Sequence, residues 1–208
     1  MNEEAYILSH IDEEGKQLAE LYRKANIQLL HPRMLAGHLQ GRILKMLVRL
    51  YRPQRILEIG TYTGYATLCL AEGLPEEGEI HTIEINDEME DFIQEQFAQS
   101  HWKDKIRLHI GDVRKIITSL DGWFDMVYID GDKRDYCEYY DCVFDRVRSG
   151  GVILADNTLW NKKVWEKPHP NDKQTQGIIL FNEKVKQDKR IEKIILPLRD
   201  GLTVIYKL

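Results

Sequence analysis

The stretch RILEIGTYTGYATLCLA, residues 55–71, decides how the chain folds, because it joins an apolar run to a helical segment through a glycine turn. The run RILEIG (55–60) predicts a buried β-strand, and Gly60 and Gly64 flank the turn that follows. In open α/β sheets, ligands bind beyond the carboxyl ends of the strands. The two glycines let the backbone come close to such a ligand, and the start of the helix offers free N–H groups to an anionic part of it.

Strands and amphipathic segments alternate along the rest of the chain. Further strands are predicted at 78–85, 105–110, 124–130 and 150–156. Such alternation predicts parallel strands joined by right-handed helical crossovers. The tail IEKIILPL-RDG-LTVIYKL (191–208) has a hairpin signature at Asp200-Gly201. We therefore expect an α/β fold with a mostly parallel sheet and a C-terminal antiparallel pair.

Helices are expected before the first strand and between the later ones. Apolar residues at helical spacing predict two N-terminal helices on either side of His31-Pro32, one marked by Leu18, Leu21, Tyr22, Ala25 and Leu29, the other by Leu39, Ile43, Leu47 and Leu50. A further helix is predicted over 87–99, capped by Asn86 or Asp87. No linker or low-complexity tract interrupts the 208 residues, so we expect one domain, 1–208.

The bulk composition restricts the function classes. A net charge of −5 disfavours a general binder of nucleic acids or of anionic membranes. No apolar run approaches the ~18 residues of a membrane span, and the acidic start MNEEAYILSHIDEEGK lacks the features of a signal peptide. Cys69, Cys137 and Cys142 form no CxxC pair or disulfide framework, so a reducing, cytoplasmic location is expected.

Acidic residues follow the second and third predicted strands. Glu84 ends the second, where a carboxylate can accept hydrogen bonds from both hydroxyls of a ribose. Gly111-Asp112 follow the third and place a second acid where an adenine amino group could sit. The glycine turn alone is equally consistent with a structural turn, but together the three strand ends favour a nucleoside ligand. The turn is GxxxG preceded by Glu58 rather than GxGxxG, which argues against NAD.

The fourth and fifth predicted strands also end in oxygen-bearing side chains. Asp130 ends one, and Asp156-Asn157 end the next. Each alone is consistent with a turn residue or a helix cap. Because adjacent strand ends lie ~5 Å apart, the three can converge on one hard cation, Mg²⁺, Mn²⁺ or Ca²⁺. Lys133 follows closely; beside a divalent cation its pKa would fall from ~10.4, which would make it a possible base.

These residues resemble a known family. The segments LEIGTYTGY (57–65), DMVYIDGDKRDY (125–136) and LADNTLWNKKV (154–164) resemble, in order and spacing, the cation-dependent O-methyltransferases, that is, catechol and caffeoyl-CoA O-methyltransferases and their small bacterial relatives. The resemblance runs from about Pro32 to the tail. It implies S-adenosylmethionine as cofactor, a Rossmann-like class I methyltransferase fold with seven strands, residues 1–52 packed over the active site, and a homodimer.

The resemblance also implies roles for individual residues. Asp130, Asp156 and Asn157 match the metal ligands, Lys133 matches the catalytic base, and Trp160 would line the acceptor pocket beside Lys133. The segment RMLAGHLQG (33–41) matches the part that closes over the cofactor. The implied cofactor contacts are Met34, Leu35, Glu58, Gly60, Thr61, Tyr62, Gly64, Tyr65, Ala66, Glu84, Ile85, Gly111, Asp112, Val113 and Asp130.

Two positions depart from the family pattern. Ala66 stands where many relatives have a serine that contacts the methionine carboxylate, so Thr61 or backbone N–H groups would take that task. Arg199 stands where relatives usually have a glycine, which would alter the rim of the pocket.

The resemblance predicts metal-assisted methylation of a small aromatic, catechol-like hydroxyl. Because some bacterial relatives methylate a hydroxyuridine in tRNA, tRNA is an alternative acceptor, and Arg42, Lys45, Arg49 and Arg52 would form a basic stripe on the second helix. A non-catalytic adenosyl-ligand binder and an NAD enzyme are weaker alternatives. The four serines lack a GxSxG context, which disfavours a serine hydrolase.

Overall fold

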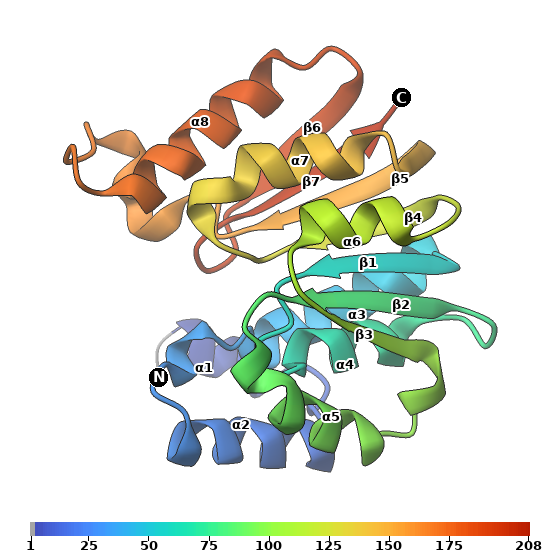
Figure 1. The fold of residues 1–208 in the computed structure, drawn as a ribbon. Coiled ribbons are helices and arrows are strands. Elements are labelled where there is room, and N and C mark those ends of the chain that lie inside the picture. The colour runs from blue at the N-terminus through green and yellow to red at the C-terminus, as the bar shows by residue number, and fades with distance from the viewer. Residues whose placement is uncertain (1–2) are drawn as a thin grey trace.

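The computed structural model describes residues 3–208, so residues 1–2 of the predicted domain lie outside the described residues. Seven strands form one sheet in the order β3-β2-β1-β4-β5-β7-β6 (Figure 1). Their bounds are β1 Arg55–Ile59, β2 Glu79–Glu84, β3 Ile106–Ile110, β4 Phe124–Ile129, β5 Val147–Asp156, β6 Ile191–Leu196 and β7 Leu202–Lys207. Strands β1 to β5 pair in parallel, and β7 pairs antiparallel with both β5 and β6. The predicted sheet and its C-terminal hairpin are confirmed.

Helices occupy the predicted regions. They are α1 Glu3–Leu8, α2 Lys16–Gln28, α3 Gly37–Tyr51, α4 Tyr65–Gly73, α5 Glu90–Ala98, α6 Val113–Ser119, α7 Tyr136–Phe144 and α8 Lys173–Gln187, with short 3-10 turns η1 Pro32–Met34, η2 Asp87–Met89, η3 Lys103–Lys105, η4 Lys133–Asp135 and η5 Trp160–Trp165. Asn86 caps η2 by accepting a hydrogen bond from the Glu88 N–H. None of the helices within residues 3–208 combines the length and apolarity that a bilayer crossing requires.

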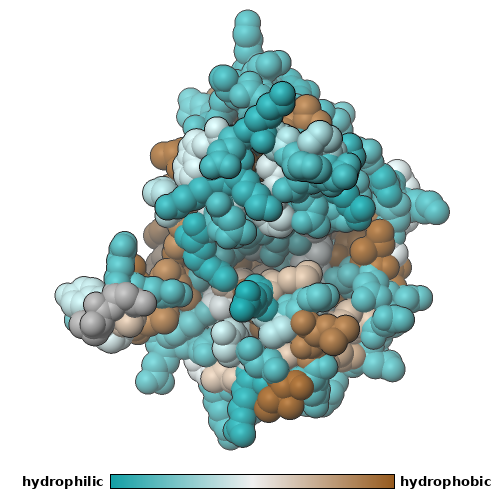
Figure 2. All heavy atoms as spheres, turned by 90° about the vertical axis from the view of Figure 1, so that its left-hand side faces the viewer, coloured by the Kyte–Doolittle hydropathy of each residue, from teal (hydrophilic) through white to brown (hydrophobic). Residues whose placement is uncertain are grey.

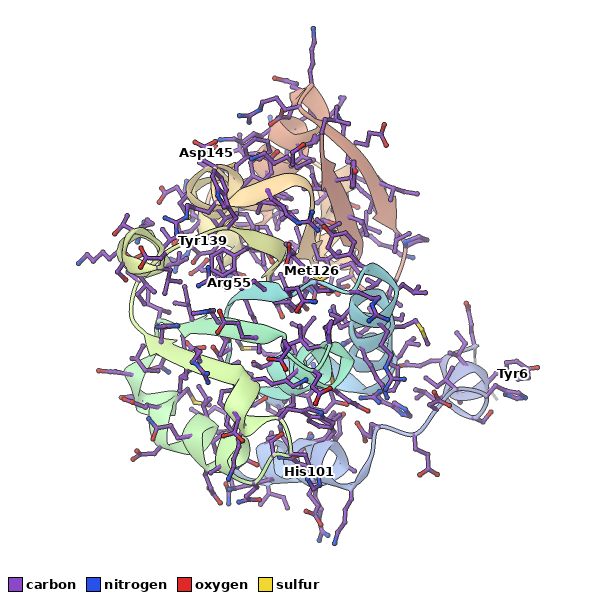
Figure 3. All side chains as sticks on the ribbon, turned by 90° about the vertical axis from the view of Figure 1, so that its right-hand side faces the viewer. Tyr6, Arg55, His101, Met126, Tyr139 and Asp145 are labelled. Carbon is purple, nitrogen blue, oxygen red and sulfur yellow. The ribbon has the colours of Figure 1, made fainter. Side chains whose placement is uncertain are left out.

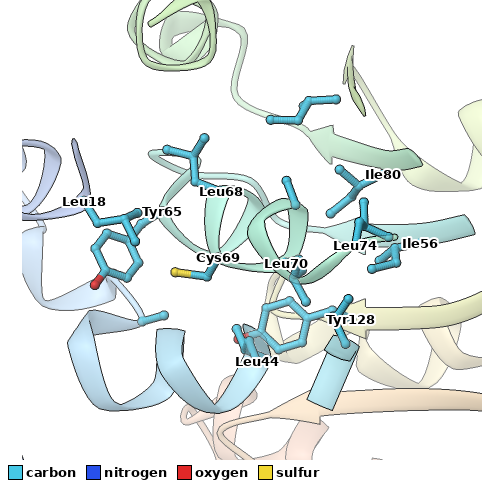
Figure 4. Close-up of a cluster of buried hydrophobic side chains, with 14 of the residues drawn as sticks. Leu18, Leu44, Ile56, Tyr65, Leu68, Cys69, Leu70, Leu74, Ile80 and Tyr128 are labelled. Atoms are coloured by element: carbon cyan, nitrogen blue, oxygen red, sulfur yellow. The ribbon is translucent and has the colours of Figure 1, made fainter. Parts of the chain in front are cut away.

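Two apolar layers hold the sheet between helices. On one face, α2, α3, α4 and α5 bury side chains such as Leu18, Leu44, Leu68 and Cys69 against Ile56 and Tyr128 (Figure 4). On the other face, α6, α7 and α8 pack against Val127, Ile153 and their neighbours. Because the parallel strands are covered on both faces, their apolar runs are continuous rather than alternating.

The second N-terminal helix buries a different face from the one that its leucines indicate. In α3 the buried residues are Gln40, Gly41, Arg42, Leu44 and Val48. Of the predicted stripe, Leu50 is 75% exposed, and Leu39, Ile43 and Leu47 are only partly buried. The close approach of α4 explains this choice, since a Cβ on Gly41 would lie 2.7 Å from the sulfur of Cys69. The apolar face of α3 therefore points partly to solvent.

The parallel strands all end at one edge of the sheet, which is the left-hand side of Figure 1. Figure 2 views the molecule from that side, where mostly hydrophilic side chains surround a recessed centre. Helix α1 stands apart from this body, as the position of Tyr6 shows (Figure 3), and it buries none of its residues. The predicted ligand-binding edge is thus open to solvent.

Candidate active site

A cavity of about 540 Å³ opens at the carboxyl edge of the sheet. Its volume lies within the range of small-molecule sites. All of the predicted site residues line it except Glu58 and Gly64. The lining residues among them are Met34, Leu35, Gly60, Thr61, Tyr62, Tyr65, Ala66, Glu84, Ile85, Gly111, Asp112, Val113, Asp130, Lys133, Asp156, Asn157 and Trp160. Most of the residues that line this cavity were therefore predicted from the sequence.

The glycine turn positions the floor of the cavity. Gly60 has φ of 97° and lies so close to the backbone of Asp130 that a Cβ would clash with the carbonyl carbon at 2.7 Å. Gly64 has φ of 80° and packs against the ring of Phe97. Both conformations are ones that side chains rarely adopt. The turn can therefore bring its backbone N–H groups to a ligand only because both positions are glycine.

Glu58 supports this turn from behind instead of facing the cavity. It is fully buried, and its Oε2 accepts hydrogen bonds from the hydroxyls of Thr67 and Thr82. Burial raises the pKa of Glu58 to about 8, so the neutral acid predominates at pH 7. The Thr61 hydroxyl shares a 2.6 Å hydrogen bond with that of Thr82, so the same network engages it. Glu58 is not among the residues that line the cavity, so its contact with the cofactor stays a prediction.

The carboxylates of Glu84 and Asp112 have different hydrogen-bond partners. The Glu84 carboxylate accepts hydrogen bonds from the Tyr62 N–H at 2.7 Å and the Asn86 N–H at 2.9 Å, which fixes its position at the end of β2. Asp112 caps α6 through the Arg114 N–H and pairs with the Arg114 guanidinium at 2.7 Å. These contacts with Arg114 lower the pKa of Asp112. Both acids line the cavity, but Asp112 has fewer free acceptor positions for a ligand.

Lys133 lies directly beside Asp130. It is only 7% exposed, and its Nζ donates hydrogen bonds to Asp130 Oδ1 at 2.8 Å and to the Tyr136 hydroxyl at 2.7 Å. The Tyr136 hydroxyl in turn donates to the backbone carbonyl of Asp156 at 3.0 Å. This chain of contacts joins the end of β4 to the end of β5. Tyr136 was not predicted, because nothing in its sequence context separates it from the core tyrosines of α7.

Asp156 is held by side chains from α3 and β4 and by the backbone of the next residue. It is 3% exposed, and its Oδ2 accepts hydrogen bonds from Gln40 of α3 and from the Tyr128 hydroxyl of β4, the latter at 2.8 Å. Its Oδ1 accepts from the Asn157 N–H at 2.7 Å. Gln40 was missed because its role depends on where α3 packs. Through Gln40, the N-terminal segment reaches the predicted metal ligands.

The residues fit a hard cation. Asp130, Asp156 and Asn157 all line the cavity, and the Asn157 side chain forms no hydrogen bond with the residues that the structure describes. Burial raises the pKa of Asp130 to about 6; the Lys133 ammonium opposes this rise and the Asp156 carboxylate adds to it. A cation would offset the repulsion between the two carboxylates.

The donor chemistry also restricts the kind of metal. Two carboxylates and one amide form an all-oxygen set, which suits Mg²⁺, Mn²⁺ or Ca²⁺ better than zinc. Within residues 3–208, no three side chains drawn from His, Cys, Asp and Glu are grouped so as to hold a metal ion. A site here therefore depends on the amide of Asn157 as its third ligand.

The predicted basic stripe on α3 does not form an open phosphate-binding surface. Arg42 is 8% exposed and pairs with Glu72 at 2.8 Å. Lys45 pairs with the same carboxylate at 2.5 Å. Arg52 follows the helix in a left-handed conformation. Glu72 of α4 thus neutralises two of the four residues of the predicted stripe, and Arg49 and Arg52 remain exposed.

Known proteins resemble the chain over most of its length. Residues 8–208 match the O-methyltransferase family model. A caffeoyl-CoA O-methyltransferase 1 from Arabidopsis thaliana is 33% identical, over 81% of this chain and 70% of that protein. A mouse catechol O-methyltransferase domain-containing protein 1 is 32% identical, over 81% of this chain and 66% of that protein.

Solved structures agree with this fold. The S-adenosylhomocysteine-bound methyltransferase PaMTH1 of Podospora anserina superimposes with a TM-score of 0.91 at 27% identity, covering 100% of this chain and 97% of that one. The O-methyltransferase TomG of Streptomyces achromogenes, in complex with S-adenosylmethionine, superimposes with a TM-score of 0.88 at 29% identity, covering 98% and 94%.

Gly177 of α8 provides a test of how Lys133 is positioned. A Cβ there would lie 2.9 Å from Arg134 Cα and 3.0 Å from the carbonyl carbon of Lys133. Alanine normally stabilises a helix relative to glycine by about 1 kcal/mol. Because backbone blocks the space, we expect Gly177→Ala instead to destabilise the fold by about 1–3 kcal/mol and to lower turnover more than about tenfold.

Urea unfolding and steady-state kinetics would measure both effects. Leu180→Ala is the matched control, since Leu180 lies on the same helix but is exposed. It should change stability by less than about 0.5 kcal/mol. A Gly177→Ala variant with wild-type stability and turnover would show that this contact does not position Lys133.

Proposed function

The chain belongs to the O-methyltransferase family, and on that premise we propose that it methylates a hydroxyl of a small, catechol-like aromatic with the help of a divalent cation. As a family member it is an S-adenosylmethionine-dependent O-methyltransferase. The proposal assigns this activity to one domain spanning 1–208.

One observation carries the proposal. Two carboxylates, Asp130 and Asp156, and the amide of Asn157 line a single cavity beside the buried side chain of Lys133. Methyl transfer from S-adenosylmethionine does not itself require such a set, because the methyl group is already activated. An acceptor with two neighbouring oxygens, however, can bind a cation that these side chains hold. Support for a catechol-like acceptor therefore comes from the ligand set rather than from a shaped aromatic pocket.

The roles of the residues follow from their positions. Asp130, Asp156 and Asn157 would hold the cation, whose charge lowers the pKa of an acceptor hydroxyl. Lys133, as the neutral amine, would accept the proton that this hydroxyl loses. Tyr136 and Asp130 fix the Lys133 amine through hydrogen bonds. Glu84 and the Gly60–Gly64 turn would bind the nucleoside and methionine parts of the cofactor.

A small acceptor is favoured over tRNA. The residues that would bind phosphates, Arg42 and Lys45, are paired with Glu72. Neutralising phosphates requires available cations. At the acceptor end, Trp160 and Gln174 line a cavity whose volume suits a small molecule.

Removal of the metal tests the central step. We expect excess EDTA to abolish methyl transfer to catechol and Mg²⁺ to restore it, because Asp130, Asp156 and Asn157 would lose their cation. Calorimetric binding of S-adenosylmethionine in EDTA is the control and should persist. Full activity in EDTA would contradict a metal-assisted mechanism.

Asn157→Gly sharpens this experiment. Asn157 has φ of 57°, so glycine keeps the backbone conformation while it removes the amide ligand. The Mg²⁺ concentration for half-maximal activity should rise at least about tenfold. An unchanged Mg²⁺ requirement would remove Asn157 from the ligand set.

Lys133→Met tests the proposed base. Methionine fills the buried space but cannot take up a proton, so turnover should fall by about a hundredfold or more. Binding of S-adenosylmethionine, measured by calorimetry, should stay nearly unchanged. Lys189→Met, which changes an exposed lysine outside the cavity lining, should retain activity. Wild-type turnover in Lys133→Met would exclude Lys133 as the base.

We further propose a homodimer through the exposed apolar side of α3 and the neighbouring sheet. Leu47 of α3, Val204 of β7 and Leu196 of β6 pack against one core cluster but remain partly exposed. Leu50 extends this surface, which resembles the apolar centre of a subunit interface.

Light scattering coupled to gel filtration would test the dimer. Leu50→Glu would place a charge in the interface, so we expect a monomer. Leu180→Glu, at a site that is 63% exposed on the opposite helical layer, should stay dimeric. A wild-type monomer at micromolar concentration would contradict the proposal.

A further inference from the structure

Arg199 lies in the turn between β6 and β7 and lines the cavity. Its φ is 47°, in the left-handed region that favours glycine. A residue with a long side chain is therefore strained at this position. Such strain at the wall of a binding site suggests that the side chain itself is used.

The Arg199 guanidinium has few partners within the protein. Its one hydrogen bond runs from NH1 to Gln40 Oε1 at 3.3 Å. It forms no ion pair with any carboxylate of residues 3–208. By contrast, the cavity's Arg114 pairs with Asp112 and Glu138, and Lys133 pairs with Asp130. Arg199 thus places a permanent positive charge at the cavity, and most of its N–H donors are unused within the described residues.

The position of Arg199 is at the acceptor end. Gln40, which accepts its hydrogen bond, also donates to Asp156. The carbonyl of the next residue, Asp200, accepts hydrogen bonds from the N–H groups of Leu159, at 2.7 Å, and Trp160, at 3.3 Å. Arg199 is therefore tied to the predicted metal ligand and to the Trp160 loop, and not to the Glu84 end of the cavity.

We infer that Arg199 binds a carboxylate carried by the methyl acceptor, so that the substrate is an aromatic acid with vicinal hydroxyls. This inference rests on the proposed function, since it assigns the hydroxyls to the Asp130, Asp156 and Asn157 end of the site. A planar guanidinium matches a carboxylate through two parallel N–H···O bonds. Arg199 is exposed at the rim of the cavity, so its guanidinium is accessible to a carboxylate bound there.

Selectivity between an acid and its ester tests this inference. We would measure kcat/KM for a dihydroxybenzoate with vicinal hydroxyls and for its methyl ester, with Mg²⁺. The wild type should prefer the acid at least about tenfold, and Arg199→Gln should remove most of that preference. No preference in the wild type, or the same preference in Arg199→Gln, would overturn the inference.

Two further variants distinguish direct binding of the carboxylate by Arg199 from general electrostatic attraction and from a structural role of Arg199. Lys162→Gln removes an exposed charge from the neighbouring loop, outside the cavity lining, so it should keep the acid preference. An equal loss in Lys162→Gln would indicate general electrostatic attraction and overturn direct binding. Arg199→Gly should lose the preference and raise the thermal midpoint, because glycine relieves the backbone strain. A lower midpoint would instead assign Arg199 a structural role.

A binding measurement distinguishes failure of this inference from failure of the proposed function. Benzoate and benzamide would be titrated by calorimetry into the protein with S-adenosylhomocysteine and Mg²⁺. If neither dihydroxy compound is methylated, the proposed function fails, yet tighter binding of benzoate to the wild type than to Arg199→Gln would still support the carboxylate site. Equal benzoate binding to both proteins would overturn it.

Discussion

The burial of two carboxylates at the ends of adjacent parallel strands is the constraint on which the site depends. Asp130 and Asp156 repel each other, and burial raises the pKa of Asp130. The fold offsets this with donors from different elements: Lys133 from η4, Tyr128 from β4 and Gln40 from α3. The site is consequently complete only when α3 is packed in place.

Close backbone approaches hold these donors in place. Gly60 lets β1 end against the backbone of Asp130, and Gly177 lets α8 lie against the backbone of Lys133. Gly41 lets α3 approach α4, which directs Gln40 inward and leaves Leu50 outside. In each case a methyl group would separate two elements that carry site residues. The same glycines are therefore needed both for the packing of these elements and for the placement of the site residues.

The two ends of the cavity differ in regularity. The end to which we assign the cofactor is built from strand ends, a glycine turn and helix caps, and Tyr62 is its one left-handed non-glycine residue among those the structure describes. The acceptor end contains the left-handed residues Asn157, Trp160, Asn161, Lys162 and Arg199. Such conformations persist only where surrounding contacts hold them, here the hydrogen bonds from the 158–160 backbone to Asp200 and Gly201. The end with more left-handed residues is thus the one to which we assign the methyl acceptor.

The sequence by itself determined the seven strands, the hairpin and more than half of the cavity residues, because period, glycine turns, strand-end acids and the family motifs are readable along the chain. Asn86 as a cap and Lys133 beside Asp130 also followed from short spacings. Tertiary structure alone decided which face of α3 is buried, that Arg42 pairs with Glu72, and that Glu58 supports the turn from behind. It also brought Gln40 to Asp156 and Arg199 to Gln40. These contacts join residues far apart in the chain, and their existence depends on how helices pack against the sheet, which no local pattern specifies.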